Sequence, residues 1–173
     1  MSSVVGGLLT RLVIDSLAAK VSDVLAGAGW FDPGRIHAPI GLIAEPVNWD
    51  VPVEPNTVVV SIRSVVTDEV ELGSQLAMDR LLGFVDFYAQ NDSLGIHLIN
   101  DLRDGLRGRL VPNDANTFPI LDFRLATPTA IGYATVVDAE VVREYRSSPE
   151  PWAAHIHRLA LVVAHTYFGE PAT

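Results

Sequence analysis

Two histidines, His155 and His157, have the residue type and the spacing that could bind a metal ion. In a β-strand, side chains two positions apart point to the same face, so both imidazoles could share one ion. A zinc site needs at least one more protein ligand. His37, His97, His165 or a carboxylate would have to supply it, and the sequence places none of them beside the pair. We therefore expect ordinary edge or interface histidines, with neither a metal nor any other cofactor.

Charged side chains are densest in the segment DLRDGLRGR, residues 101–109. Their i, i+3 and i, i+4 spacing is typical of ion pairs on a solvated helix face. Asp101 and Asp104 lack the nearby partner that a catalytic carboxylate pair requires. The chain also has no cysteine, no glycine-rich phosphate loop, no G-x-S-x-G turn and no H-E-x-x-H motif. The sequence therefore predicts no catalytic residue and no enzymatic activity.

Asp86 is the acidic residue whose surroundings most need an explanation. It lies between Phe84 and Tyr88, and a strand would place all three side chains on one face. A carboxylate among aromatic side chains needs a cationic partner, because an unpaired charge is costly to bury. We expect an Arg or Lys of a neighbouring subunit to provide that partner.

Hydrophobic periodicity and turn residues divide the chain into helices and strands. Helices are predicted over residues 3–28 and from Asp92 or Ser93, either of which could be the cap, to about residue 110. Strands are predicted over residues 57–66, 76–90, 118–125, 131–145 and 152–168. This order predicts a single α+β domain over residues 1–173, with a mainly antiparallel β-sheet and two α-helices packed on one face.

A long proline-rich loop or arm separates the first helix from the first of these strands. Its five prolines, within residues 30–56, disfavour a continuous helix or a central strand. Trp30, Phe31 and Trp49 make it too apolar to remain in water, so we expect it to pack on its own domain or on a neighbouring copy. Further along, we expect the acidic link of residues 67–74 to extend the flanking strands as a hairpin arm.

Apolar side chains occupy both faces of the predicted strand 76–90. Leu81, Val85 and Phe87 share one face, and Leu82, Phe84 and Tyr88 share the other. Two helices can cover only one side of a sheet, so loops or another copy of the protein must cover the second. A sandwiched core strand and a subunit interface both remain open. The predicted strand 131–145 also alternates, and the side chains expected on one of its faces are Ile131, Tyr133, Val137, Val141 and Tyr145.

The second helix carries a leucine stripe at i, i+4 spacing that is expected to face the core. This stripe consists of Leu94, Leu98, Leu102 and Leu106. Gly95 and Gly105 in the same helix each cost about 1 kcal/mol relative to alanine. We expect both glycines to permit a close approach of neighbouring elements.

The balance of charge limits the partners of this protein. Twelve basic and twenty-one acidic residues give a net charge of -9, whereas binding to nucleic acid phosphates needs clustered Lys and Arg. An acidic wall would instead let DNA slide past without adhering. Arg11, Asp15 and Lys20 interrupt the first apolar stretch, so we expect no signal peptide, no membrane span and a soluble protein made in the cytoplasm.

The order and character of these segments resemble the tail terminator proteins of long-tailed siphophages, in particular those that infect actinobacteria. The resemblance covers a leading helix, a VVV-type strand, an ELGS link and the stretch FVDFYAQNDSLGIHLINDLRDGLRGRL. It continues through DFRLATPTAIGYATVVDAEVVRE and the closing PWAAHIHRLALVVAHTYF, and so spans most of the chain. The 27-residue proline-rich loop departs from the family pattern.

The resemblance implies a structural protein of the virion, located at the junction of tail and neck after assembly in the host cytoplasm. Such proteins form a homohexameric ring that caps the tail tube, ends its polymerisation and presents a surface for head–tail joining. The implied partners are the major tail tube protein and a head-completion, stopper or connector protein. DNA would pass through the lumen without specific binding, past about 6 × -9 = -54 charges.

We assign candidate assembly residues within this frame. Phe84, Asp86 and Tyr88 are expected at a subunit interface. Asp68, Glu69 and Glu71 are expected in a contact loop or a loop that lines the lumen. Two alternatives remain: another neck, head-completion or tail tube protein of the same phage module, and a metal-dependent hydrolase that uses His155 and His157.

Overall fold

The computed structural model describes residues 2–32, 40–45, 53–69, 76–107, 116–142 and 155–168, with only the backbone described at 2–10, 65–69, 76–78 and 166–168. The described helices are α1 (Ser2–Gly27) and α2 (Asp92–Arg107). The described strands are β1 (Gly41–Ala44), β2 (Thr57–Glu69), β3 (Leu76–Ala89), β4 (Thr117–Asp122), β5 (Thr129–Val142) and β6 (His155–Phe168).

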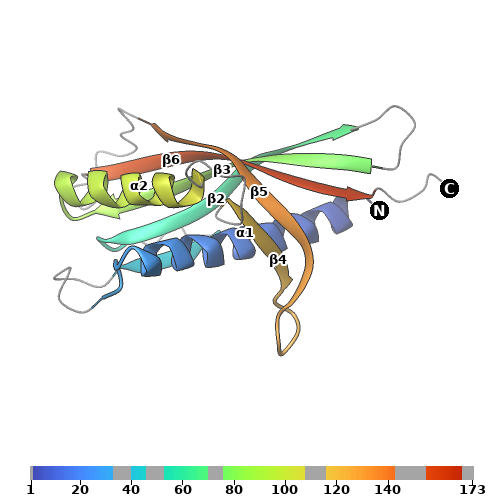
Figure 1. Ribbon diagram of the computed structural model, residues 1–173, viewed down its shortest axis with the longest axis horizontal. Coiled ribbons are helices and arrows are strands. Elements are labelled where there is room, and N and C mark those ends of the chain that lie inside the picture. The colour runs from blue at the N-terminus through green and yellow to red at the C-terminus, as the bar shows by residue number, and fades with distance from the viewer. Residues whose placement is uncertain are drawn as a thin grey trace.

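The described strands form a six-stranded sheet in the order β1-β2-β3-β6-β5-β4. β1 runs parallel to β2, and the other neighbouring strands are antiparallel. α1 contacts β1 and β2 near one edge and β4 at the other, so the sheet curls around this helix (Figure 1). α2 covers the middle of the same face, against β3, β6 and β5. The predicted α+β fold with both helices on one face is confirmed.

The main core lies between the two helices and the concave face of the sheet. The predicted stripe of α2 faces this core: Leu98, Leu102 and Leu106 are fully buried, and Leu94 packs at its margin. α1 contributes Leu17, Val21 and Leu25, and the strands contribute Val58, Val60, Val85 and Phe87. Each fully buried large apolar side chain contributes about 1.5–3 kcal/mol by its removal from water.

Two glycines of α2 allow its close contacts, as predicted. A Cβ on Gly105 would lie 2.4 Å from a methyl carbon of Val24 in α1. A Cβ on Gly95 would lie only 2.0 Å from the imidazole ring of His157 in β6. At both positions glycine lowers the helix propensity but allows the neighbouring side chain to pack closely against the helix.

Among the described residues, apolar side chains cover the convex face of the sheet at one end. There Val53, Val59, Tyr88 and Ile156 form a second, smaller apolar cluster. Val53 belongs to the proline-rich segment, so this part of the segment packs on its own domain. Further along β3, Leu82 is 39% exposed. The strand is thus sandwiched near Tyr88, as one of the two expectations had it, and exposed near Leu82, where a subunit interface stays a prediction.

Three features of the strands differ from the sequence prediction. The proline-rich segment contains the four-residue strand β1, which forms a sheet edge. β4 ends at Asp122, and a turn follows where the strand was expected to continue to residue 125. A bulge at Val137 shifts the register of β5, so Ile131 and Tyr133 are exposed while Val141 packs against the core. Placing all of these on one face was therefore wrong, because a bulge changes which side chains point inward.

The predicted extension is present in the backbone over residues 67–69, whereas residues 70–74 of the link lie outside the described residues. β2 continues to Glu69, which pairs with Ala77 at the start of β3. β6 runs alongside, with Phe168 opposite Leu76, so three strands extend together past α2 toward the end where α1 begins (Figure 1).

Candidate assembly surface

Asp86 and Arg158 form an ion pair on the convex face of the sheet. They are cross-strand neighbours on β3 and β6, and the guanidinium donates to both carboxylate oxygens, at 2.7 and 2.8 Å. The side chains are only 5% and 14% exposed, respectively. The guanidinium carbon also lies 4.2 Å from the centre of the Phe84 ring, a cation–π distance. The expectation of a partner from a neighbouring subunit was wrong, because the same chain supplies it.

The three residues of β3 that were expected at a subunit interface, Phe84, Asp86 and Tyr88, therefore have different environments. Tyr88 is buried in the second apolar cluster, and Asp86 is enclosed by its pair with Arg158. Phe84 is partly exposed and remains accessible to a partner. Among the acidic candidates, Asp68 and Glu69 lie on the β2 part of the extended arm, but their side chains and all of Glu71 lie outside the described residues.

His155 and His157 meet an acidic residue at the start of α2. The Nε2 atom of His157 lies 3.0 Å from Oδ1 of Asp92, and Nδ1 of His155 lies 3.8 Å from the same oxygen. Asn91 caps α2, because its Oδ1 atom accepts a hydrogen bond from the Leu94 amide at 2.9 Å. The Asp92 side chain is therefore not needed as the cap and can contact the histidines. The predicted cap at residue 92 or 93 was one or two positions late.

No group of three or more His, Cys, Asp or Glu side chains that could hold a metal ion occurs in the part of the chain that the structure describes. His155, His157 and Asp92 lie together between β6 and α2, with both imidazoles within 4 Å of the same carboxylate oxygen. Within the described residues the pair thus has no further ligand in metal-binding geometry, and His37, another of the candidate ligands, lies outside them.

Among the described residues, the three most exposed apolar side chains form a row that the sequence did not reveal as a surface. Ile131, Tyr133 and Val137 on β5 are 55%, 64% and 63% exposed; we call these three residues the hairpin row. Phe123 and Leu125, also exposed, lie at the tip of the same β4–β5 hairpin. The alternation of residues 131–137 is visible in the sequence, but the bulge that turns this row outward is not.

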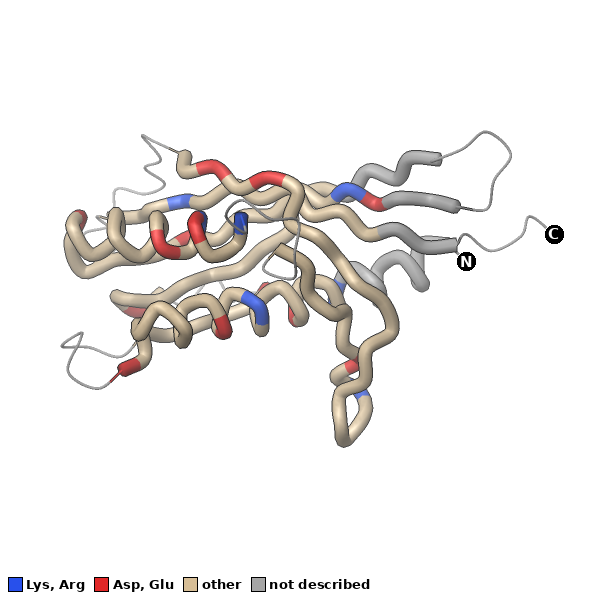
Figure 2. The backbone as a smooth tube through the Cα atoms, viewed as in Figure 1, with Lys and Arg blue, Asp and Glu red and all other residues tan. Residues whose placement is uncertain are grey.

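The β4–β5 hairpin projects beyond α1 and is nearly free of charge (Figures 1 and 2). Between residues 116 and 137 the charged residues are Asp122 and Arg124, which cancel. The base of the hairpin is fixed to the body because the Leu121 amide donates to the Ser16 hydroxyl of α1 at 2.9 Å. A neutral apolar projection thus extends from a strongly acidic protein.

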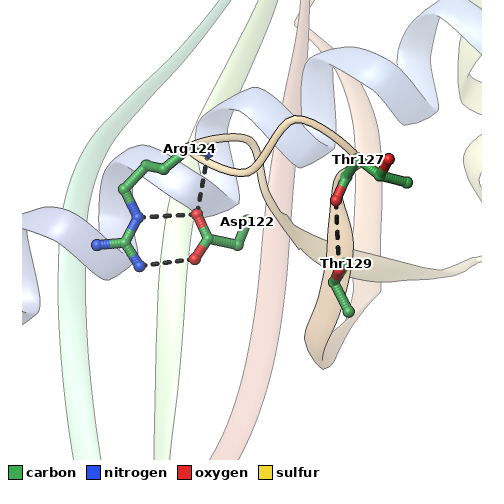
Figure 3. A network of polar contacts seen from close by, with 4 residues as sticks. All are labelled: Asp122, Arg124, Thr127 and Thr129. Carbon is green, nitrogen blue, oxygen red and sulfur yellow. Dashed lines mark hydrogen bonds and ion pairs between the residues drawn. The ribbon is translucent and has the colours of Figure 1, made fainter.

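The turn of this hairpin is held by a fork between Asp122 and Arg124 (Figure 3). The Arg124 side chain donates to the two carboxylate oxygens at 2.8 and 2.6 Å, and its backbone amide donates at 3.0 Å. The side-chain hydrogen bonds, followed by the backbone one, lower the pKa of Asp122 from 3.8 to about 2. Thr129 closes the turn by donating its hydroxyl to the Thr127 carbonyl at 3.3 Å.

His165 is a buried titratable residue near the other end of the hairpin strands. It lies on β6 opposite Ala134, and its ring approaches Gly132 of β5. Burial lowers its pKa from the usual 6.5, an effect that the Asp79 carboxylate partly opposes. The neutral imidazole is therefore the form that the fold accommodates.

No protein-family model matches this sequence, and no curated protein matches it with significant similarity. No helix within the described ranges is long and apolar enough to cross a membrane.

Proposed function

We propose that this protein is a structural subunit of a phage virion that assembles into a ring on the end of the tail tube. The ring ends tube polymerisation and offers the surface to which the head-completion or connector protein binds. The resemblance in the order of segments suggests this role, and the α+β fold is compatible with it. The protein acts by assembly and performs no chemistry.

The exposed hairpin row is the observation that carries the proposal. Monomeric proteins rarely expose several large apolar side chains side by side, and such patches mark interaction sites. Here Ile131, Tyr133 and Val137 are each more than half exposed. They lie on a hairpin without net charge in a chain of net charge -9. Copies of an acidic protein repel one another, so a neutral apolar surface is where they can approach most easily.

The overall charge fits a channel for DNA. Six copies would bring about 6 × -9 = -54 charges together. Like charge on the lumen wall would keep the phosphate backbone from adhering while DNA passes. The same charge argues against a role in binding nucleic acid.

Growth of tail tubes in the presence of the protein tests this function. The tail tube protein of the same phage is polymerised with the chain, and with an unrelated acidic protein of similar size as the control. Tubes grown with the chain should be shorter, and their capped ends should not resume growth when fresh tube protein is added.

The same assay separates the alternatives within the phage module. A tail tube component would be incorporated along the whole tube and would not limit its length. A head-completion protein would bind the head connector and leave tube growth unchanged. Either result would contradict the proposed capping role.

A further inference from the structure

We infer that the hairpin row of one copy docks on the central strands of a second copy of this chain. The receiving surface is a group of four apolar side chains on the convex face, which we call the central patch. It consists of Leu82, Phe84, Ala160 and Val162. The inference rests on the ring assembly proposed above and names the contact that would build it.

The central patch has the composition of a docking surface. Leu82 pairs across the strands with Val162, and Phe84 pairs with Ala160, so all four side chains lie on the face away from the helices. The guanidinium of Arg158 lies over the Phe84 ring and fixes its position. The patch is therefore apolar and held in place before any partner arrives, which lowers the entropy cost of binding.

The exposed area matches what one side of a stable interface needs. Ile131, Tyr133 and Val137, with Phe123 and Leu125 at the tip, are 40–64% exposed. At about 150–250 Å² for a large side chain, they present roughly 500 Å² of apolar surface. A standard interface buries about 800 Å² per partner, of which about 56–65% is apolar. These five residues therefore supply most of the apolar area that one partner contributes.

The shape of the molecule favours a head-to-tail contact over a self-complementary one. The sheet curls around α1, so its face away from the helices is convex (Figure 1). The hairpin row lies on this same face of the sheet, but on a hairpin that projects beyond α1, so it can lie along the middle of a neighbour's sheet. A contact between two different surfaces repeats from copy to copy and closes into a ring if the rotation allows it.

Charge is compatible with a second copy as the occupant. The hairpin carries no net charge, and the four side chains of the central patch are uncharged. The rim of the patch carries both signs, because Asp138 and Glu140 border it on β5 and Arg80 lies on the same face of β3 as Leu82. A neutral hairpin brings no like charge to either part of this rim.

Two single substitutions test the two surfaces of the contact separately. Tyr133→Glu places a charge in the hairpin row, and Leu82→Glu places one in the central patch. Ile96→Glu is the matched control, because Ile96 is 48% exposed on α2, on the opposite side of the sheet. The native mass of each protein is measured by light scattering from low to high micromolar concentration, and circular dichroism verifies the fold.

The expected results follow from a head-to-tail contact. The wild type and Ile96→Glu should assemble, up to about 6 × 18.7 = 112 kDa for a closed hexamer. Tyr133→Glu and Leu82→Glu should each have a dissociation constant raised by at least about 30-fold, the effect of losing an interface hot spot. An equimolar mixture of the two should recover a species of 2 × 18.7 = 37.4 kDa, because each variant retains the half that the other lacks.

Three results would overturn the inference. The first is a folded Tyr133→Glu or Leu82→Glu variant that assembles like the wild type. The second is a mixture of the two that stays at 18.7 kDa. The third is a wild type that remains a monomer at every concentration. Tube growth reports on the proposed function separately, since a ring held by other surfaces would still cap tubes.

Discussion

The buried pair between Asp86 and Arg158 leads to a quantitative prediction about stability. Both side chains are almost enclosed, at 5% and 14% exposure, and they are joined by two short hydrogen bonds. Removing one partner of such a pair leaves an uncompensated charge, which typically costs about 3–5 kcal/mol. Since Arg158 retains some contact with water, we expect Asp86→Leu to lower the free energy of unfolding by about 3 kcal/mol. In a domain of this size that corresponds to roughly 6–12 °C in Tm.

The double variant gives the sharper test. Arg158→Met should cost slightly more than Asp86→Leu, because it also removes a cation–π contact with Phe84 worth about 0.5–1 kcal/mol. Asp86→Leu combined with Arg158→Met leaves no unpaired charge, so its loss should be well below the sum of the single losses. We expect a coupling free energy of about 2–3 kcal/mol.

Urea unfolding of the four proteins, at one protein concentration that keeps all of them monomeric, measures this coupling. The matched control is Arg107→Met, which breaks the exposed 3.5 Å pair with Asp138 and should cost less than about 1 kcal/mol. Losses at Asp86 and Arg158 that add within about 0.5 kcal/mol would refute the reasoning, because independent residues behave in that way.

Three further predictions concern single residues. Burial lowers the pKa of His165 below 6.5, so the unfolded chain binds more protons than the folded protein as the pH drops below 6.5. The free energy of unfolding should therefore fall with falling pH in this range, by at most about 1.4 kcal/mol per pH unit. In urea unfolding, His165→Gln should make the free energy of unfolding less dependent on pH. Gly95→Ala should destabilise the fold by about 1–3 kcal/mol despite the better helix propensity, because its Cβ would overlap the His157 ring; an unchanged Tm would contradict that packing. The Asp122 carboxylate should titrate near pH 2 when it is followed by NMR, and Arg124→Gln should return the pKa of Asp122 toward 3.8. A wild-type pKa already near 3.8 would show that the hydrogen bonds from Arg124 to Asp122 are absent in solution.

The sequence predicted correctly those parts of the fold that depend on residues close together in the chain. The leucine stripe of α2 follows from 3.6-residue periodicity alone, and Leu98 and Leu102 are buried accordingly. Gly95 and Gly105 stood out because glycine is costly inside a helix. Their neighbours, His157 and Val24, could not be read from the same pattern, since helix propensity carries no information about distant segments.

Features that depend on long-range pairing were missed or misassigned. Arg158 is 72 positions from Asp86 and becomes its partner only because β6 lies beside β3. The strand β1 has four residues in a proline-rich segment, and its pairing with β2 defines it more than its composition does. The bulge at Val137 places Val141 on the opposite face from Ile131 and Tyr133, although alternation alone puts all three together. Register is a property of the assembled sheet, so alternation within one strand does not determine it.

The ends of tail tubes offer the most direct test of the central claim, that this protein is a ring-forming cap. Tubes grown with the purified chain can be imaged by electron cryomicroscopy, and the density at each end compared with that of tubes grown without it. The account predicts an additional ring at one end, with an open channel and a mass near 6 × 18.7 = 112 kDa. Bare ends on every tube, with the chain remaining free in solution or spread along the tube wall, would contradict it.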